Sequence, residues 1–320
     1  MMLTMVATQP VYSEVLLDLA KRDSRIVTVD ADLMRSVGSG AMALELPERS
    51  FQMGVAEQNM IGFSAGLASC GKVPFAHTFG VFSSRRACDQ LTISVAFNQL
   101  NVKVVGGQAG LTAALNGATH QSLEDVAIVR AIPGMTIVEP CDILELRQAI
   151  AAVAEFVGPV YLRMPKVLPM LLGSEGYQFK MGSIRLLRDG RDLTFVTSGV
   201  MAAYTMDAVE KLDAEGVSAR VLNASTLKPL DRDALLNAAR DTGAVVTVEN
   251  HNICGGLGGA VTELLSGTLP TPVVRVGIQD TFGATGELSY LVERFGLTPD
   301  DIVAAARRAL SLKAGAPRAA

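Results

Sequence analysis

The sequence has few of the residues that build metal sites and disulfide frameworks: its 320 residues include four cysteines, three histidines and no tryptophan. The cysteines are Cys70, Cys88, Cys141 and Cys254. They are far apart and form no C-x-x-C pair, so neither a zinc site nor a disulfide framework is indicated, and we expect reduced thiols in the core. No apolar run is long enough to span a bilayer, and the first residues lack the cationic region of a signal peptide. We therefore expect a cytoplasmic protein with no membrane partner.

An excess of charge of one sign is also missing. The chain has 28 basic and 32 acidic residues, which give a formal net charge of -4, and no long run of either sign. This balance argues against nucleic acid as a partner. Hydrophobic residues make up 49% of the chain, which is enough for two ordinary domains with cores.

Short β-branched runs alternate with segments of helical spacing along the whole chain. The expected strands are 25–29, 51–53, 73–82, 102–105, 135–138, 160–162, 193–197, 218–222, 245–248 and 273–276. The expected helices are 12–20, the segment from about 56, 143–155 and 202–215. This alternation predicts an α/β fold with two doubly wound domains, each with a parallel sheet.

Proline and glycine concentrate near the middle of the chain, between Met164 and Gly182. Such a composition is typical of an interdomain connector. We therefore predict a first domain at residues 1–165, a linker at 166–183 and a second domain at 184–320.

One carboxylate stands among small and apolar neighbours. A strand is expected to end near Met53, and after a turn at Gly54 a helix is expected to begin near Ala56, with Glu57 in its first turn. An acid there ordinarily complements the helix dipole. The helix continues with Gly62, Ser64, Ala65, Gly66, Ala68 and Ser69. Another backbone could approach these small residues closely, and desolvation in that contact would raise the proton affinity of the carboxylate.

Other polar residues and glycines fall where ligands bind in α/β folds, but each also has a structural interpretation. Asp30 and Asp32 lie at the carboxyl end of an expected strand, where open sheets bind ligands and where acids also form turns. The loop 106–121 is long and rich in glycine and alanine, which is common for functional loops. The G-G-L-G-G run invites a dinucleotide interpretation, but Val261 stands where its third glycine would be.

Several motifs occur in the order in which transketolases carry them. These are G-V-A-E-Q-N-M, P-F-A-H-T-F-G-V-F, R-A-C-D-Q, G-A-T-H-Q-S-L-E-D, V-V-T-V-E-N-H-N-I-C-G-G-L-G and F-G-A-T-G-E-L. Together they cover nearly the whole chain, which most closely resembles the smaller, C-terminal subunit of a split transketolase. The resemblance implies a thiamine diphosphate-binding fold, with a pyrimidine-binding domain followed by a transketolase C-terminal domain.

The resemblance implies cofactor contacts for four residues. Glu57 matches the glutamate that bonds a ring nitrogen of the aminopyrimidine of thiamine diphosphate, and is also expected to be catalytic. Asp32 matches an aspartate beside the cofactor, and Phe79 and Phe82 match aromatic residues packed against the pyrimidine ring. By burial statistics alone, both phenylalanines would be assigned to the core.

For the substrate, the resemblance implies contacts from Ser36 and Arg163 to a phosphate, and from His120, with a catalytic role, to hydroxyls. The chain departs from the family at Gln9, Gln108, Leu115 and Asn116. Family members commonly have arginine at the first of these positions, histidine at the second and a glutamate-aspartate pair at the last two. We include Gln108 and Asn116 among the expected substrate-binding residues. Glutamine lacks the charged fork with which arginine binds phosphate, so we expect a shifted substrate range, with weaker selection for a phosphate or with a branched or otherwise unusual sugar as substrate.

The G-D-G motif and downstream asparagine with which the family holds magnesium and the diphosphate are not found in this sequence. The resemblance therefore implies that this chain binds the pyrimidine side of thiamine diphosphate and that Mg²⁺ is bound by a larger partner subunit. We expect an α2β2 assembly with the helix after Glu57 at the boundary between subunits. The implied reaction is transfer of a two-carbon ketol unit from a ketose to an aldose, with no activity for the chain alone.

Three other functions stay open at this point. The beta subunit of a 2-oxo acid dehydrogenase shares the two-domain plan and the glutamate role, and a deoxyxylulose phosphate synthase-like enzyme uses the same cofactor. A regulatory subunit that kept the fold without activity is the third. His251, in the E-N-H motif, is a weaker site candidate, for which a capping or core role is expected.

Overall fold

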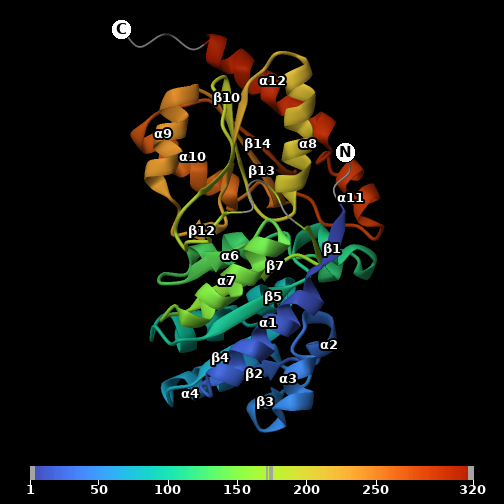
Figure 1. Ribbon diagram of the computed structural model, residues 1–320, viewed down its shortest axis with the longest axis vertical. Coiled ribbons are helices and arrows are strands. Elements are labelled where there is room, and N and C mark those ends of the chain that lie inside the picture. The colour runs from blue at the N-terminus through green and yellow to red at the C-terminus, as the bar shows by residue number, and fades with distance from the viewer. Residues whose placement is uncertain (1–3, 171, 173–175, 316–320) are drawn as a thin grey trace.

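The computed structural model describes residues 4–170, 172 and 176–315 and contains three sheets (Figure 1). The largest has the strand order β12-β6-β7-β5-β4-β2-β3. Its strands are β2 (Ile26–Asp30), β3 (Ser50–Gln52), β4 (Val73–Phe79), β5 (Lys103–Gly107), β6 (Thr136–Val138), β7 (Val160–Met164) and β12 (Thr226–Lys228). All neighbouring pairs are parallel except β12 and β6, which are antiparallel.

Helices cover both faces of this sheet. They are α1 (Thr8–Arg22), α2 (Met34–Val37), α3 (Gly40–Glu45), α4 (Glu57–Ser69), α5 (Cys88–Gln90), α6 (Asp125–Ala131) and α7 (Ile143–Glu155). Shorter 3₁₀ and π turns are η1 (Pro47–Arg49), η2 (Phe82–Arg86), η3 (Leu91–Ala96), η4 (Gly110–Asn116) and η5 (Ala118–His120).

Consecutive strand residues point to opposite faces, and the core divides accordingly. Val105 and Leu162 pack in one hydrophobic cluster with residues of α1 and α7. Their neighbours Val104 and Tyr161 pack in a second cluster with residues of α4 and α6. Strands buried on both faces are typical of parallel sheets between helix layers, which confirms the predicted doubly wound arrangement.

The second large sheet has the order β14-β13-β10-β11-β9 and is parallel except for β9. Its strands are β9 (Arg185–Arg188), β10 (Leu193–Thr197), β11 (Ala219–Asn223), β13 (Val245–Asn252) and β14 (Val273–Ile278). The helices around it are α8 (Met201–Ala214), α9 (Arg232–Thr242), α10 (Leu257–Thr268), α11 (Leu288–Arg294) and α12 (Pro299–Gly315). Helix α12 packs against α8, whereas α10 packs against α9 (Figure 1).

Local signals explain where several helices begin and end. The Asp142 side chain accepts a hydrogen bond from Glu145 N–H at 2.7 Å and caps α7, and Asp231 caps α9 in the same way. Helix α9 ends at Gly243, whose φ of 67° is the left-handed conformation that glycine adopts readily.

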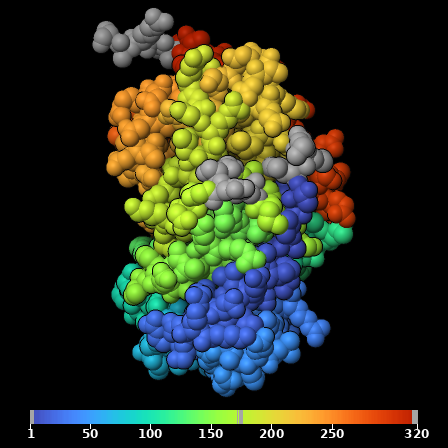
Figure 2. Space-filling view, in the orientation of Figure 1, coloured from blue at the N-terminus to red at the C-terminus, as the bar shows by residue number. Residues whose placement is uncertain are grey.

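The predicted linker is partly a strand. Within residues 166–183, β8 (Val167–Pro169) pairs antiparallel with β1 (Met5–Ala7) in a two-stranded sheet. The chain also crosses back later, because β12 comes from the sequence after the connector and completes the edge of the first sheet. We call residues 4–165 the first half and residues 184–315 the second half; Figure 2 shows them stacked along the long axis of the molecule.

The four cysteines are free, as expected, but their predicted place in the core is wrong for two of them. Cys70 follows the last residue of α4 and Cys254 lies in the turn after β13, and both are exposed. Cys141 is buried and Cys88 is half-buried. Among the described residues, no helix combines the length and apolar character needed to cross a bilayer.

Candidate active site

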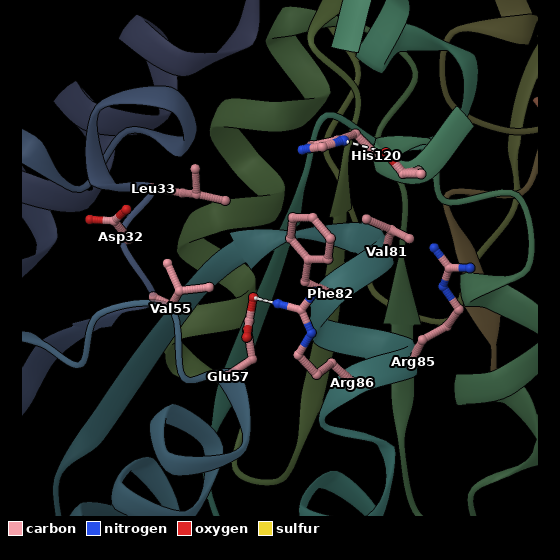
Figure 3. Close-up of a pocket in the computed structure, with 11 residues that line it drawn as sticks. Asp32, Leu33, Val55, Glu57, Val81, Phe82, Arg85, Arg86 and His120 are labelled. Carbon is pink, nitrogen blue, oxygen red and sulfur yellow. Dashed lines mark hydrogen bonds and ion pairs between the residues drawn. The ribbon is translucent and has the colours of Figure 1, made fainter. Parts of the chain in front are cut away.

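A cavity of about 780 Å³ opens beyond the carboxyl ends of β2 and β4 (Figure 3). Ligands bind at this edge of open α/β sheets. The cavity is lined by Ala31, Asp32, Leu33, Val55, Glu57, Val81, Phe82, Arg85, Arg86, Thr119 and His120. Four of the residues predicted from the sequence to be in the site, Asp32, Glu57, Phe82 and His120, are therefore brought together.

Glu57 begins α4, and its side chain is only 1% exposed although it lines the cavity. Its Oε1 accepts a hydrogen bond from Arg86 Nη1 at 2.7 Å (Figure 3). Its Oε2 is buried and has no hydrogen-bond partner among the described residues. An unsatisfied buried carboxylate oxygen costs free energy, so this atom is suited to bond a ligand in the cavity.

Arg86 is a site residue that the sequence did not reveal. The Arg86 guanidinium pairs with Glu57 and lies 4.6 Å from the centre of the Phe82 ring. The π-helical turn η2 carries Phe82, Arg85 and Arg86 to the cavity wall, and such turns are frequent at functional sites. Arg85 pairs instead with Glu124, with 2.9 Å between Nε and Oε1.

The aromatic residues form a cluster behind and beside the cavity. Phe82 lines the cavity, whereas Phe79 is buried behind it, with the two rings nearly parallel and 6.1 Å apart. The His120 ring meets both edge-on, at 5.3 Å from Phe82 and 6.1 Å from Phe79. Thr119 Oγ1 lies 2.9 Å from His120 Nδ1, and this hydrogen bond orients the imidazole. Of the two predicted phenylalanines, only Phe82 offers its surface to a ligand here.

Asp32 lies on the cavity rim with a φ of 64°. Its backbone N–H donates to Gln52 Oε1 at 2.7 Å, which holds the turn after β2. Ser36 is exposed on α2 but does not line the cavity. Gln108 and Asn116 also lie outside the cavity lining, and they bond each other, with Asn116 Nδ2 donating to Gln108 Oε1 at 2.7 Å. The structure therefore does not gather these three predicted substrate residues around the cavity.

Arg163 cannot contact a substrate in this structure, contrary to the sequence-based prediction. Its side chain is 1% exposed, its Nε bonds Asp125 at 2.9 Å and its Nη1 bonds Glu139. Its Nη2 donates to the carbonyl oxygens of Ser122 and Asn250. The guanidinium is thus enclosed and fully engaged, because two carboxylates from other elements converge on the end of β7. Its bonds tie β7 to neighbouring parts of the first half, and its bond to the carbonyl oxygen of Asn250 reaches the second half.

A second buried polar cluster links α1 to strands β2 and β4. Tyr12 Oη and His77 Nε2 are 2.6 Å apart, and His77 Nδ1 is 3.7 Å from Asp30 Oδ1, which Ser39 also bonds. Burial raises the pKa of Asp30 to about 7 and lowers the pKa of His77 to about 3. His77 is therefore neutral at physiological pH.

His251 is buried and does not line the cavity, in agreement with the expected core role. Its Nδ1 is 2.6 Å from the carbonyl oxygen of Asn252. Burial lowers its pKa to about 4. Among the described residues there is no group of three or more His, Cys, Asp or Glu side chains that could hold a metal ion.

Comparison with known proteins identifies the family. Residues 4–170 match the family profile described as "Transketolase, pyrimidine binding domain", and residues 182–302 match "Transketolase, C-terminal domain". The chain belongs to the transketolase family. The resemblance stated from the motifs is confirmed, and so is the predicted two-part α/β fold. Membership of this family implies thiamine diphosphate as the cofactor.

Three transketolase-family proteins illustrate the similarity. The chain is 48% identical over 302 residues to the 6-deoxy-6-sulfo-D-fructose transketolase subunit SqwH of Clostridium sp. (strain MSTE9), covering 94% of each chain. It is 37% identical to one of the subunits of the apulose-4-phosphate transketolase of Phocaeicola vulgatus, covering 93% of this chain and 96% of that one. A solved structure of a split gene transketolase, an inactive beta4 tetramer, superposes with a TM-score of 0.87 at 41% identity, covering 96% and 99%.

Proposed function

We propose that this chain is the small subunit of a thiamine diphosphate-dependent transketolase, which transfers a two-carbon ketol unit from a ketose to an aldose and is active with a larger partner subunit. The observation that carries the proposal is the buried, unpartnered Oε2 of Glu57 in the wall of a cavity that also presents an aromatic ring. The relatives named above support the same activity.

The residues of the cavity fit the pyrimidine end of the cofactor. An aminopyrimidine is flat and has both apolar faces and polar edges. Phe82 can pack on a face, Leu33 and Val55 add apolar surface, and Glu57 Oε2 can meet a ring nitrogen. When bound, thiamine diphosphate supplies the electron sink for breaking and forming the carbon–carbon bond.

The side chains of this chain then have separate tasks. Arg86 occupies Glu57 Oε1, so Oε2 is the oxygen left to hold or share a proton with the ring nitrogen. His120 is fixed through Nδ1 by Thr119, and we therefore assign its Nε2 to a substrate hydroxyl. Asp32 lies on the rim opposite His120 in Figure 3 and is proposed to border the cofactor.

The test is Glu57→Gln in the complex reconstituted with the partner subunit, thiamine diphosphate and Mg²⁺. The amide keeps the shape and an oxygen for Arg86 but cannot exchange a proton, so kcat should fall by about 10²–10⁴-fold while the cofactor still binds. Glu48→Gln, a change of an exposed acid on η1, is the matched control and should leave kcat unchanged. Near-full activity of Glu57→Gln would remove Glu57 from the mechanism and overturn the assignment.

We propose that the partner subunit covers the outer face of α4, in an α2β2 assembly, and supplies the site for Mg²⁺ and the diphosphate. On this face a Cβ added at Gly62 or Gly66 would meet no atom within 4 Å, and Phe63 is exposed beside them. The adjoining turn η3 packs against α4 and exposes Ile93, and the next residue after η3, Phe97, is exposed as well. Such an apolar strip with small residues lets a second backbone approach closely.

Gly66→Trp tests this surface, because the open space should allow the chain to fold. The variant should lose the complex with the larger subunit in size-exclusion chromatography with light scattering, while its circular dichroism stays that of the wild type. A variant that still forms the complex would place the interface elsewhere. We also propose a cytoplasmic location, which cell fractionation can check.

The substrate is proposed to differ from the ordinary pair of xylulose 5-phosphate and ribose 5-phosphate. The bonded Gln108–Asn116 pair and Gln9 stand where family members carry charged or imidazole groups for the substrate. A ketose with a sulfonate, as in the name of the first relative, or a branched or otherwise unusual ketose is the favoured donor class. The reconstituted enzyme should be assayed with xylulose 5-phosphate, 6-deoxy-6-sulfo-D-fructose and apulose 4-phosphate. A clear preference for xylulose 5-phosphate with ribose 5-phosphate would contradict this part of the proposal.

The same assay separates the alternatives. Decarboxylation of pyruvate with transfer to a lipoyl acceptor would indicate a 2-oxo acid dehydrogenase, and condensation of pyruvate with glyceraldehyde 3-phosphate would indicate a deoxyxylulose phosphate synthase. Absence of turnover with every donor would favour the regulatory role.

We also keep the division into domains at 1–165 and 184–320, with the connector at 166–183, as a proposal. The extents of the two family matches, 4–170 and 182–302, support it. Limited proteolysis should cut within the connector, and the two fragments should co-elute because β12 stays paired with β6.

A further inference from the structure

The segment 108–121 carries His120, and its backbone adopts conformations that need support. We call it the His120 segment. Gln108 has a φ of 52° and Ala114 a φ of 47°, both in the left-handed region that residues with a Cβ rarely adopt. Such conformations are unfavourable and persist only when the surroundings hold them. The second half of the chain provides that support at both ends of the segment.

Asn250, near the end of β13, holds the start of the segment. Its Oδ1 accepts the N–H of Leu111 at 2.9 Å, and its Nδ2 donates to the carbonyl oxygen of Ala109 at 3.2 Å. Between them is Gly110, with a φ of 61°, where an added Cβ would collide with the side chain and carbonyl of Asn250. The amide is buried, so both bonds form away from water and each is costly to lose.

Gln121 holds the other end of the segment. Its Nε2 donates to the carbonyl oxygen of Ala284 at 2.8 Å, and its Oε1 accepts the Ala284 N–H at 3.1 Å. Close by, a Cβ at Gly117 would come within 2.6 Å of Thr285 Oγ1, so the segment lies directly on the second half here as well. Helix α11 packs against η4 in the middle of the segment.

We infer that the second half of the chain is a template for the His120 segment and that Asn250 and Gln121 are positioning residues for His120. Each amide uses both its donor and its acceptor on backbone groups of the opposite half. The two pairs of bonds fix where the segment begins and ends, and the imidazole is thereby set edge-on against Phe82. The link to activity rests on the proposed contact between His120 and the substrate, whereas the template itself does not.

Asn250→Asp is the sharpest perturbation because the side chains have the same shape. A carboxylate can accept from Leu111 N–H, but it places a second acceptor against the carbonyl oxygen of Ala109 in a buried site. The start of the segment should therefore separate from β13. Gln121→Glu should have the same effect at the other end of the segment, because it replaces the donor to the carbonyl oxygen of Ala284 by a second acceptor.

The first experiment needs no partner and no activity. The experiment is NMR spectroscopy of the isolated full-length chain with isotope-labelled histidine. The imidazole signal of His120 is assigned by its loss in His120→Gln, and its chemical shift includes a ring-current contribution from the two neighbouring phenylalanine rings. Asn250→Asp and Gln121→Glu should each remove most of that shift, and the signal of the buried His77 should not move. Thr194→Val removes a bond to Thr242 within the second half and is the control that leaves His120 unchanged. An unchanged His120 signal in both amide variants, with the fold retained, would overturn the inference.

The second experiment is a double-mutant cycle in the reconstituted enzyme. Asn250→Asp should lower kcat/KM roughly tenfold, mainly through KM, and the same change in the His120→Ala background should have less than about a twofold effect. Fully additive effects would show that Asn250 does not act through His120. If the complex has no transketolase activity at all, the proposed function fails, whereas the histidine signals still decide the template.

Discussion

Replacing Arg86 by methionine should lower the free energy of unfolding of the isolated chain, because it removes the partner of a buried carboxylate. Glu57 is 1% exposed and has one bonded oxygen, at 2.7 Å from Arg86 Nη1. Removing one member of a fully buried ion pair costs about 3–5 kcal/mol. Arg86 is 48% exposed, so water screens the pair, and we expect a smaller loss of about 1–3 kcal/mol.

Glu57→Gln supplies the other side of a thermodynamic cycle. The amide oxygen can keep the bond to Arg86, and no buried charge is left, so the free energy of unfolding should stay the same or rise. In this background, Arg86→Met should cost less than about 1 kcal/mol, because no carboxylate is left unpaired. Glu57→Gln would then be neutral or stabilising for the fold while it removes turnover, as is common for strained functional sites.

The assay is urea denaturation of the four chains at neutral pH, followed by circular dichroism, with the midpoints compared at a common slope. Arg85→Met is the matched control from the same turn, since its pair with Glu124 is exposed on both sides and should be worth less than about 1 kcal/mol. An equal cost of Arg86→Met in both backgrounds would refute the idea that Glu57 is held by Arg86 with one oxygen left for a ligand.

Three further changes test other parts of the structure. Asp30→Asn should remove a pH dependence of the free energy of unfolding. The pKa of Asp30 is about 7 in the folded chain, against an ordinary pKa of 3.8. Its contribution to stability is therefore complete below pH 3.8 and is lost as the pH rises through 7. In urea titrations, the stability of the variant relative to the wild type should therefore rise between pH 5 and 8. Plots of unfolding free energy against pH that run parallel for the two proteins would contradict this. Phe82→Ala should weaken thiamine diphosphate binding by the reconstituted complex roughly tenfold in calorimetry, through lost ring packing; an unchanged Kd would remove it from the cofactor site. Arg163→Met should lower the free energy of unfolding by about 3–5 kcal/mol, because Asp125 and Glu139 lose their partner. Unchanged stability with a raised KM for a sugar phosphate would instead support a role of Arg163 in substrate binding.

The parts predicted best from the sequence are those that local patterns determine. Helix α7 at Ile143–Glu155 and strand β10 at Leu193–Thr197 have the predicted bounds. Apolar residues at helical spacing mark α7, which begins after its capping Asp142, and a short apolar and β-branched run marks β10. Glu57 and His120 were found through short motifs, and the structure places both on one cavity. In each case the information lies within a few neighbouring residues.

What the sequence did not reveal depends on contacts between distant residues. The pairing of Arg86 with Glu57 joins positions 29 apart, and its geometry depends on a π-helical turn that has no simple periodic signature. The burial of Arg163 follows from carboxylates on two other elements, so a strand-end arginine could not be told from a substrate ligand. The edge strand β12 is only three residues long and belongs to a sheet made by the other half.

The crossover of β12 also limits how related chains can be recombined. A chimera joined within the connector would bring Thr226–Lys228 from one parent onto the sheet edge of the other. The ladder is made by backbone groups, and Lys228 Nζ reaches the carbonyl oxygens of Arg130 and Ile132 rather than their side chains. The β12 contact therefore depends little on the recipient's side chains. The amide contacts of Asn250 and Gln121 do depend on them, so a chimera should keep its two halves docked only where the parents share Asn250, Gln121 and Gly110 as well as the lysine and the strand length of β12.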